Sequence, residues 1–151
     1  MIIRAARPEE AALLSALALR SKAHWGYDAA FLAACVEELT LDPAKVAEHR
    51  TVVAERDAQV LGFATLEGGA PTAELGMLFV EPDWIGRGVG RLLFDHVRGS
   101  ALDLGCTALS IGADPYAEPF YLAMGAARIG TTASASVPGR LLPLLEVALA
   151  R

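Results

Sequence analysis

Apolar and polar residues along this chain follow two different periods, and the change between them predicts its secondary structure. Residues 2–5 are mostly apolar and predict a short first strand. After Pro8, apolar residues recur at helical spacing over 13–18, and two glutamates stand in the first turn, where negative charge is favoured. Residues 21–27 break this pattern, and Asp28 then predicts the N-cap of a second helix that continues through residue 36.

From residue 51 onward, short apolar runs separated by turn residues predict strands. Residues 51–54 and 60–66 form an expected antiparallel hairpin, and a turn at 68–71 leads to a strand over 74–80. A helix follows and ends at Gly105, then a strand over 107–112 and a helix that opens with Asp114 and Pro115. Two last strands are expected at 127–132 and 141–149. Seven strands and four helices in this order predict one α+β domain with a mixed sheet over residues 1–151.

Composition limits the kinds of protein this chain can be. Hydrophobic residues make up 54% of its 151 residues, which is enough for a sizeable core. The formal net charge of -5 argues against nucleic acid as a partner. Glu9 and Glu10 interrupt any apolar signal region, and no apolar run is long enough for a membrane span. Cys35 and Cys106 show no metal or disulfide spacing, so we expect two buried thiols, no metal and a reducing cytoplasm.

A glycine-rich segment over residues 86–91, Gly-Arg-Gly-Val-Gly-Arg, is the most informative motif in the chain. It lies between the apolar run 75–80 and the helical run 92–97, so it joins a strand to the start of a helix. Backbone N–H groups at a helix N-terminus are unpaired, and the helix dipole favours an anion there. Glycines allow a ligand to approach the backbone closely. The segment therefore predicts a site for a ligand that carries a pyrophosphate.

Two motifs, together with the order of elements, give the sequence a family resemblance. The first is the run over residues 80–93, which contains the glycine loop, and the second is Ala117-Glu-Pro-Phe-Tyr-Leu-Ala-Met-Gly125. The chain resembles the GCN5-related N-acetyltransferase (GNAT) superfamily over nearly its whole length. The resemblance implies a mixed, mostly antiparallel sheet of about seven strands flanked by about four helices. It also implies acetyl-CoA as co-substrate and transfer of its acetyl group to a primary amine of a small molecule or protein.

The resemblance carries coenzyme contacts over to particular positions. The amides of the glycine loop would hold the pyrophosphate, the edge of the preceding strand would pair with the pantetheine arm, and Asp114 stands where many relatives have a coenzyme-contacting asparagine. Ile85 departs from the family pattern, because arginine or glutamine usually stands there, and Arg87 or Arg91 could compensate. The expected coenzyme-binding residues are Leu78, Phe79, Val80, Gly86, Arg87, Gly88, Val89, Gly90, Arg91 and Asp114.

Acetyl transfer needs a neutral amine and a proton or charge stabilisation for the leaving thiolate. Tyr121 stands where the family often keeps a tyrosine near the sulfur, and we expect it to donate that proton; the alternative is a packing aromatic. Glu74 stands eleven residues before Ile85, the spacing of the base in histone-type relatives, and is the candidate base. The alternative for Glu74 is a solvated strand end, because many relatives deprotonate the amine through water. Glu67, Glu81 and Glu118 are weaker candidates for the base and are interpreted as surface charges.

The acceptor pocket is expected after the first helix, where His24, Trp25 and Tyr27 follow one another closely. Histidine can take a proton near neutral pH, and an aromatic pair can enclose a cationic amine. Ordinary packing in the turn is the alternative for these residues. Arg140 could overhang the site and meet a carboxylate, whereas His49 and His96 are interpreted as structural.

Two other functions compete with the enzyme. One is a module that binds acyl-CoA as a sensor without turnover, which the absent charge at Ile85 keeps open. The other is a dinucleotide-binding domain, which fits poorly because the glycines at 86, 88 and 90 do not have the spacing of that fingerprint. The negative charge favours a cationic acceptor. A homodimer could form if the apolar strand over 141–149 pairs across subunits.

Overall fold

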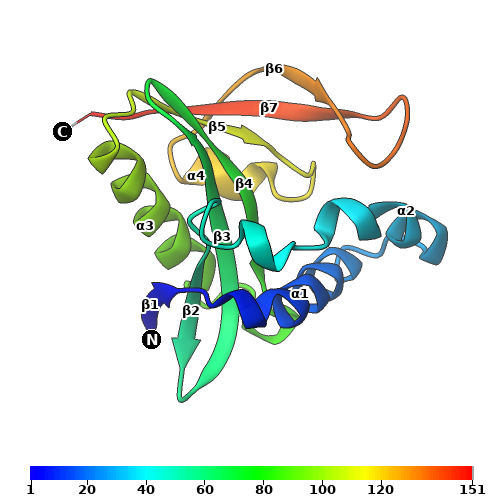
Figure 1. Ribbon diagram of the computed structural model, residues 1–151. Coiled ribbons are helices and arrows are strands. Elements are labelled where there is room, and N and C mark those ends of the chain that lie inside the picture. The colour runs from blue at the N-terminus through cyan, green and yellow to red at the C-terminus, as the bar shows by residue number, and fades with distance from the viewer. Residues whose placement is uncertain (151) are drawn as a thin grey trace.

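Seven strands form one mixed sheet in the computed structural model, which describes residues 1–150 (Figure 1). The spatial order is β1-β2-β3-β4-β5-β7-β6. All neighbouring pairs are antiparallel except β4 with β5, which is parallel. This confirms the mixed sheet expected from the sequence. The strands are β1 (Ile2–Ala5), β2 (Val52–Arg56), β3 (Gln59–Gly69), β4 (Thr72–Val80), β5 (Ala108–Gly112), β6 (Ala127–Ala133) and β7 (Leu141–Ala148).

Helices cover both faces of the sheet (Figure 1). On one face, α3 (Val89–Asp103) and α4 (Glu118–Ala123) pack on a first core that includes Leu93 and Phe94. On the other face, α1 (Ala11–Ala23) and α2 (Ala29–Leu39) cover a second core that includes Leu14 and Phe63. Short 3-10 helices occur at Pro8–Glu10, Pro43–Lys45 and Pro82–Trp84. No helix within residues 1–150 combines the length and the apolarity that crossing a membrane requires.

β4 and β5 are in register over three residue pairs, Thr72–Glu74 with Ala108–Ser110. Beyond these pairs the two strands part, and residues 75–80 of β4 keep β3 as their one strand neighbour within the described sheet. The backbone groups of this segment that point away from β3 therefore have no strand partner there. A strand edge inside the sheet is thus opened to a ligand.

A β-bulge marks the place where the strands part. Leu75 pairs with Leu66 of β3 and Met77 pairs with Thr65, so Gly76 is an extra residue in β4. The bulge also changes the face that the following side chains meet. Leu75 belongs to the first core, whereas Met77, two residues later, packs against the second core. Strict alternation would keep both on one face.

Several element boundaries differ from those expected. The predicted break at residues 21–27 begins later, because α1 continues to Ala23. The helix expected to open at Asp114 begins instead at Glu118, and the Asp114 carboxylate accepts a hydrogen bond from the Tyr116 amide (2.8 Å) in the turn before it. Asp28 does cap α2 through the Phe31 amide (2.8 Å), as predicted. Both cysteines are buried, as expected.

The expectation that the last strand pairs across two subunits is wrong. β7 lies between β5 and β6 and is hydrogen-bonded to both, so both of its edges are occupied within the chain. The apolar residues of β7 reflect burial inside the sheet: Leu145 and Val147 belong to the first core. The strand at this end of the sheet is β6.

A buried ion pair ties β1 to the start of α1. The Arg4 guanidinium donates to both carboxylate oxygens of Glu10 at 2.9 and 2.8 Å and also contacts Glu55 of β2. The Arg7 amide donates to Glu10 as well (2.8 Å). The Arg4 hydrogen bonds outweigh the cost of burial and hold the pKa of Glu10 at about 2. Glu10 therefore stabilises the fold above the usual glutamate pKa, and this contribution is lost as the pH falls toward 2.

We expect Glu10→Gln to lower the free energy of unfolding by about 1–2 kcal/mol at pH 7, and by less at pH 3, because the wild-type carboxylate has itself lost part of its advantage there. Urea unfolding at both pH values measures this difference. Glu9→Gln is the matched control, because the Glu9 side chain is 72% exposed and its one ion pair, with Arg7, is long (3.5 Å). An equal loss for Glu10→Gln at both pH values would contradict the assignment.

Candidate active site

A cavity of about 830 Å³ opens where β4 and β5 part. Its wall follows residues 74–80 of β4 and 111–114 at the end of β5, and it reaches from the α1–α2 side to the N-terminus of α3. Leu78, Phe79 and Val80, the residues expected along the pantetheine arm, all line it. The cavity thus joins the open strand edge to the glycine loop.

The glycine loop presents unpaired backbone amides to this cavity. Gly88 is the N-cap of α3 with a φ of 87°, and Gly86 has a φ of 82°, both in the left-handed region that favours glycine. Gly86, Gly88, Gly90 and Arg91 line the cavity. Within residues 1–150, the amides of these four residues and of Val89 donate no backbone hydrogen bond. The arrangement fits an anion at a helix N-terminus.

Arg87 differs from the rest of the loop. Its amide already donates to the Trp84 carbonyl (3.3 Å), and its guanidinium lies 5.1 Å from the centre of the Trp84 ring, so neither group faces the cavity. Val89 is buried and does not line the cavity, so the unpaired amides of the four lining residues, rather than all six of the loop, are open to a ligand. Ile85 packs against the first core and also lines the cavity. Arg91 lines the cavity as well, and it is exposed.

Tyr121 lies where α4 meets the cavity. Its side chain is 6% exposed and packs against Phe94 and Phe120, with ring centroids 6.1 and 5.1 Å away. Its hydroxyl makes no hydrogen bond with residues 1–150, yet it is not enclosed by protein. Burial, and then the Asp114 carboxylate, raise the pKa of Tyr121 well above that of free tyrosine. The hydroxyl therefore holds a proton that it could donate, although the raised pKa makes it a weaker acid than free tyrosine.

Glu74 faces the same cavity from β4, at the last residue pair before the strands part. Partial burial, and then the neighbouring Glu67 carboxylate, raise the pKa of Glu74 above its usual value. A carboxylate with a raised pKa is a better proton acceptor than a solvated one. Geometry and charge are both consistent with the base expected at this position.

Two side chains that the sequence did not assign to the site also line the cavity. Glu67, interpreted as a surface charge, lies over the backbone of Gly76: a Cβ there would be 1.5 Å from its Oε2 atom. Glu67 accepts a hydrogen bond from Thr65 (3.1 Å), and the Nε2 atom of His49 lies 3.8 Å from its Oε1 atom. His49, interpreted as structural, therefore faces the site. The β-bulge that brings Glu67 over Gly76 leaves no clear signal in the sequence.

Of the three residues expected in the acceptor pocket, Trp25 lines the cavity, whereas Tyr27 and His24 do not. Trp25 lines the cavity and stacks on Tyr116, with ring centroids 5.5 Å apart, so the loop after α1 meets the loop after β5. Tyr27 is next to the cavity and reaches it through Asp114. His24 is exposed and does not line the cavity; its ring contacts Trp25 edge-on. The structure thus brings Trp25 to the site and leaves His24 outside.

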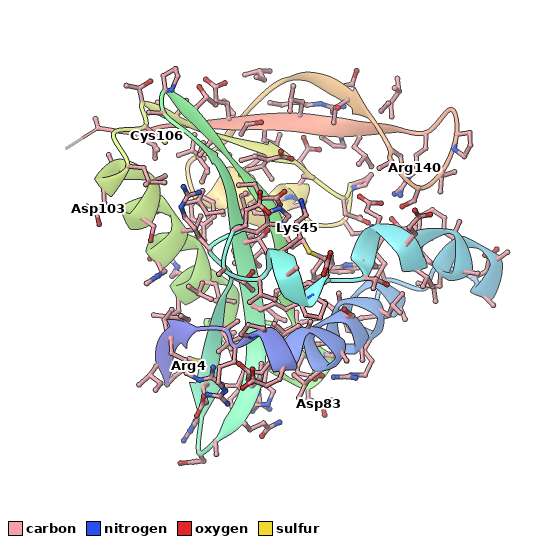
Figure 2. All side chains as sticks on the ribbon, viewed as in Figure 1. Arg4, Lys45, Asp83, Asp103, Cys106 and Arg140 are labelled. Atoms are coloured by element: carbon pink, nitrogen blue, oxygen red, sulfur yellow. The ribbon has the colours of Figure 1, made fainter. Side chains whose placement is uncertain are left out.

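Asp114 is the centre of a polar cluster rather than a free coenzyme contact. It accepts hydrogen bonds from Lys22 (2.7 Å) and Tyr27 (2.9 Å), and Arg140 lies 3.9 Å away. Arg140 also donates to the Tyr27 hydroxyl (2.8 Å), and Figure 2 shows it reaching from the β6–β7 end toward α2. Burial alone would raise the pKa of Asp114, but the Lys22 ammonium holds it below its usual value.

Arg140 does not line the cavity, and the carboxylate near it is that of Asp114, so the expected role of Arg140 over the acceptor site stays a prediction. Burial and the Asp114 hydrogen bond raise the pKa of Tyr27 to about 12.

Glu81 and Glu118 pair with Arg20 and Arg128, away from the cavity, as expected of surface charges. Among residues 1–150, no group of three or more potential ligands is arranged to hold a metal ion.

Comparison with known proteins identifies the family. A family model described as the acetyltransferase (GNAT) domain matches residues 14–135. The chain therefore belongs to the GNAT acetyltransferase family. None of the curated protein sequences compared with the chain matches it.

Solved structures agree with this assignment. A GCN5-related N-acetyltransferase from Rhodopseudomonas palustris, also described as aminotransferase, class-II, is 26% identical with a TM-score of 0.81, over 98% of this chain and 95% of that one. PaiA N-acetyltransferase from Thermoplasma acidophilum, in complex with coenzyme A, is 17% identical with a TM-score of 0.81, over 97% and 98%. Ribosomal-protein-alanine N-acetyltransferase from Brucella melitensis is 21% identical with a TM-score of 0.70, over 99% and 100%.

Proposed function

We propose that this protein transfers the acetyl group of acetyl-CoA to a primary amine that is bound in the same cavity. One observation carries the proposal. The open edge of β4 leads, through the short 3-10 helix Pro82–Trp84, to a loop with four unpaired amides at the cavity, and Glu74 and Tyr121 line the cavity that joins them. A strand edge can pair with an amide-bearing arm, and the loop can hold the pyrophosphate at its end.

The residues present fit coenzyme A. The four unpaired amides of the cavity-lining loop residues and the α3 dipole supply the phosphate site. Arg91 supplies a cation at the cavity wall, where Ile85 supplies none. Asp114 is engaged with Lys22 and Tyr27, so a direct contact from Asp114 to the coenzyme stays a prediction that requires part of this cluster to rearrange.

When bound, acetyl-CoA supplies an activated acetyl group as a thioester. Within residues 78–80, the amides that point away from β3 can donate to its carbonyl oxygen and stabilise the charge that develops there. Glu74, directly or through a water, takes a proton from the acceptor amine, so that the nitrogen lone pair forms the new C–N bond. Tyr121 gives its proton to the sulfur as the C–S bond breaks, and the second proton that the attacking nitrogen loses as the amide forms returns to the Tyr121 oxygen, directly or through water. A free thiol and an amide are left, and Glu74 releases the first proton to solvent.

We expect Gly88→Asp to weaken acetyl-CoA binding by at least about 100-fold, because a carboxylate would occupy the phosphate site. Gly105→Asp is the matched control: Gly105 has a similar positive φ (83° against 87°), open space around its Cβ position, and no place in the cavity lining. Both variants carry the same backbone strain. Calorimetric titration with acetyl-CoA compares them, and equal affinity for the two variants would remove the phosphate role from the loop.

Tyr121→Phe should lower kcat by about 10²–10³-fold while the acetyl-CoA Kd changes less than about threefold, because the lost hydroxyl acts on the leaving sulfur and not on binding. Tyr116→Phe is the control, since Tyr116 also lines the cavity but is exposed and stacked on Trp25. Steady-state kinetics with a saturating amine measures both. Parallel losses of kcat and affinity in Tyr121→Phe would make Tyr121 a packing residue.

The pH dependence of kcat should show a proton acceptor with a raised pKa. Glu74 accepts a proton in its charged form, which exists above its pKa, so kcat should fall as the pH drops through a value above that of an ordinary glutamate. We expect Glu74→Gln to lower kcat by about 100-fold and to abolish this limb. An acid limb that is unchanged in Glu74→Gln would assign deprotonation to another group.

A further inference from the structure

Five polar side chains gather on one wall of the cavity, on the α1–α2 side of the sheet, and the proposed reaction uses one of them, Glu74. They come from the loop before β2, from β3 and from β4. We call the set the acidic floor; its members are His49, Thr51, Thr65, Glu67 and Glu74.

The two carboxylates of the acidic floor face each other without a permanent cation between them. Glu67 and Glu74 are directly opposed residues of β3 and β4, so their side chains lie on the same face of the sheet. Within residues 1–150, no lysine or arginine lies within ion-pair distance of either carboxylate, and His49 is 3.8 Å from Glu67. The nearby Arg50 instead donates to the carbonyl oxygens of Leu66 and Gly68, at 3.3 and 2.8 Å. Two opposed like charges are unfavourable until a cation arrives.

Thr51 adds an independent sign of a polar ligand. It is 3% exposed and lines the cavity, and among residues 1–150 its Oγ1 atom is the buried side-chain polar atom that has no hydrogen-bond partner. Thr51 stands one residue before the Val52–Ala64 pair of β2 and β3, which places it beside Thr65. A buried hydroxyl without a partner costs free energy, and a ligand that donates a hydrogen bond would recover it.

The charge of this half of the cavity also favours a cation. The acids that line it outside the Asp114 cluster are Glu38, Asp42, Glu67 and Glu74. Lys45, which is labelled in Figure 2, also lines the cavity, and it pairs with Glu48 at 3.4 Å. Lys22 already donates a hydrogen bond to Asp114, and Arg140 already donates one to Tyr27. Within residues 1–150, a carboxylate next to the acceptor nitrogen would thus meet Glu67 and Glu74, while Lys45 is engaged by Glu48 and Arg91 lies at the glycine-loop end of the cavity.

We propose that the acidic floor binds a second cationic nitrogen of the acceptor, beside the nitrogen that is acetylated, so that the acceptor is a diamine or polyamine without a neighbouring carboxylate. This inference rests on the proposed acetyl transfer. In it, Glu74 takes the proton of the reacting nitrogen, while Glu67, oriented by Thr65, holds the second ammonium together with the Thr51 hydroxyl. His49, whose Nε2 atom lies 3.8 Å from the Oε1 atom of Glu67, lies at the edge of this site.

The test compares 1,4-diaminobutane with butylamine, which has the same chain and lacks the second nitrogen. Acetylation is followed by thiol release at pH 8 with saturating acetyl-CoA. The wild-type protein should show a kcat/KM at least about tenfold higher for the diamine. Glu67→Gln should raise the KM for the diamine by at least about tenfold, with kcat and the KM for butylamine changed less than about threefold.

Two further variants distinguish a specific effect on diamine binding from a general effect on the fold. Glu37→Gln removes a carboxylate that is exposed and outside the cavity lining, and it should leave the diamine preference intact. Thr51→Val keeps the shape of the side chain and removes the hydroxyl. It should raise the KM for the diamine, whereas removal of a merely structural hydroxyl would leave KM unchanged.

The outcomes separate this inference from the proposed function. Equal use of the two amines by the wild type, or an unchanged diamine preference in Glu67→Gln, overturns the inference and leaves acetyl transfer in place. If acetyl-CoA binds but no amine releases thiol, the proposed function fails. Calorimetric titration of the coenzyme A-bound protein with 1,4-diaminobutane then decides the role of the acidic floor: binding that Glu67→Gln weakens supports it, and absence of binding overturns it.

Discussion

The parting of β4 from β5 after Glu74 is the constraint on which the candidate site depends. A sheet normally satisfies its backbone groups by pairing, and an unpaired strand segment beside a cavity costs free energy unless solvent or a ligand meets it. Here the bulge at Gly76 turns the strand and changes which side chains face each core. The open edge and the cavity begin at this irregularity, and the opposed glutamates stand in the regular pairing immediately before it.

The site connects three parts of the chain that are distant in sequence. The glycine loop supplies amides at the N-terminus of α3, α4 supplies Tyr121, and the β3–β4 pair supplies Glu67 and Glu74. The cluster around Asp114 joins Lys22 of α1 to Arg140 at the start of β7, so that both walls of the cavity are fixed relative to each other. A rigid arrangement of this kind is what differential stabilisation of a transition state requires.

Local sequence patterns predicted most of the fold because each rests on short-range physics. Asp28 caps α2 through its own side chain, and Gly105 takes the positive φ that ends α3, so both signals are visible within a few residues. The glycine loop was found for the same reason. The predictions that were wrong concern residues whose surroundings are set by contacts between distant parts of the sequence. Asp114 looked like a helix cap, but its partners are 92 and 87 residues away in the sequence. Glu67 looked like a surface charge because the bulge that brings it over Gly76 depends on the pairing of two strands.

The central claim is that the cavity between β4 and β5 holds acetyl-CoA and an amine together. Calorimetric titration of the purified protein with acetyl-CoA, followed by thiol release with a panel of amines, tests it most directly. We predict binding with one coenzyme per chain and thiol release that depends on the added amine. Absence of acetyl-CoA binding would contradict the assignment of the glycine loop, and binding without thiol release for any amine would show a protein that holds the coenzyme without turnover.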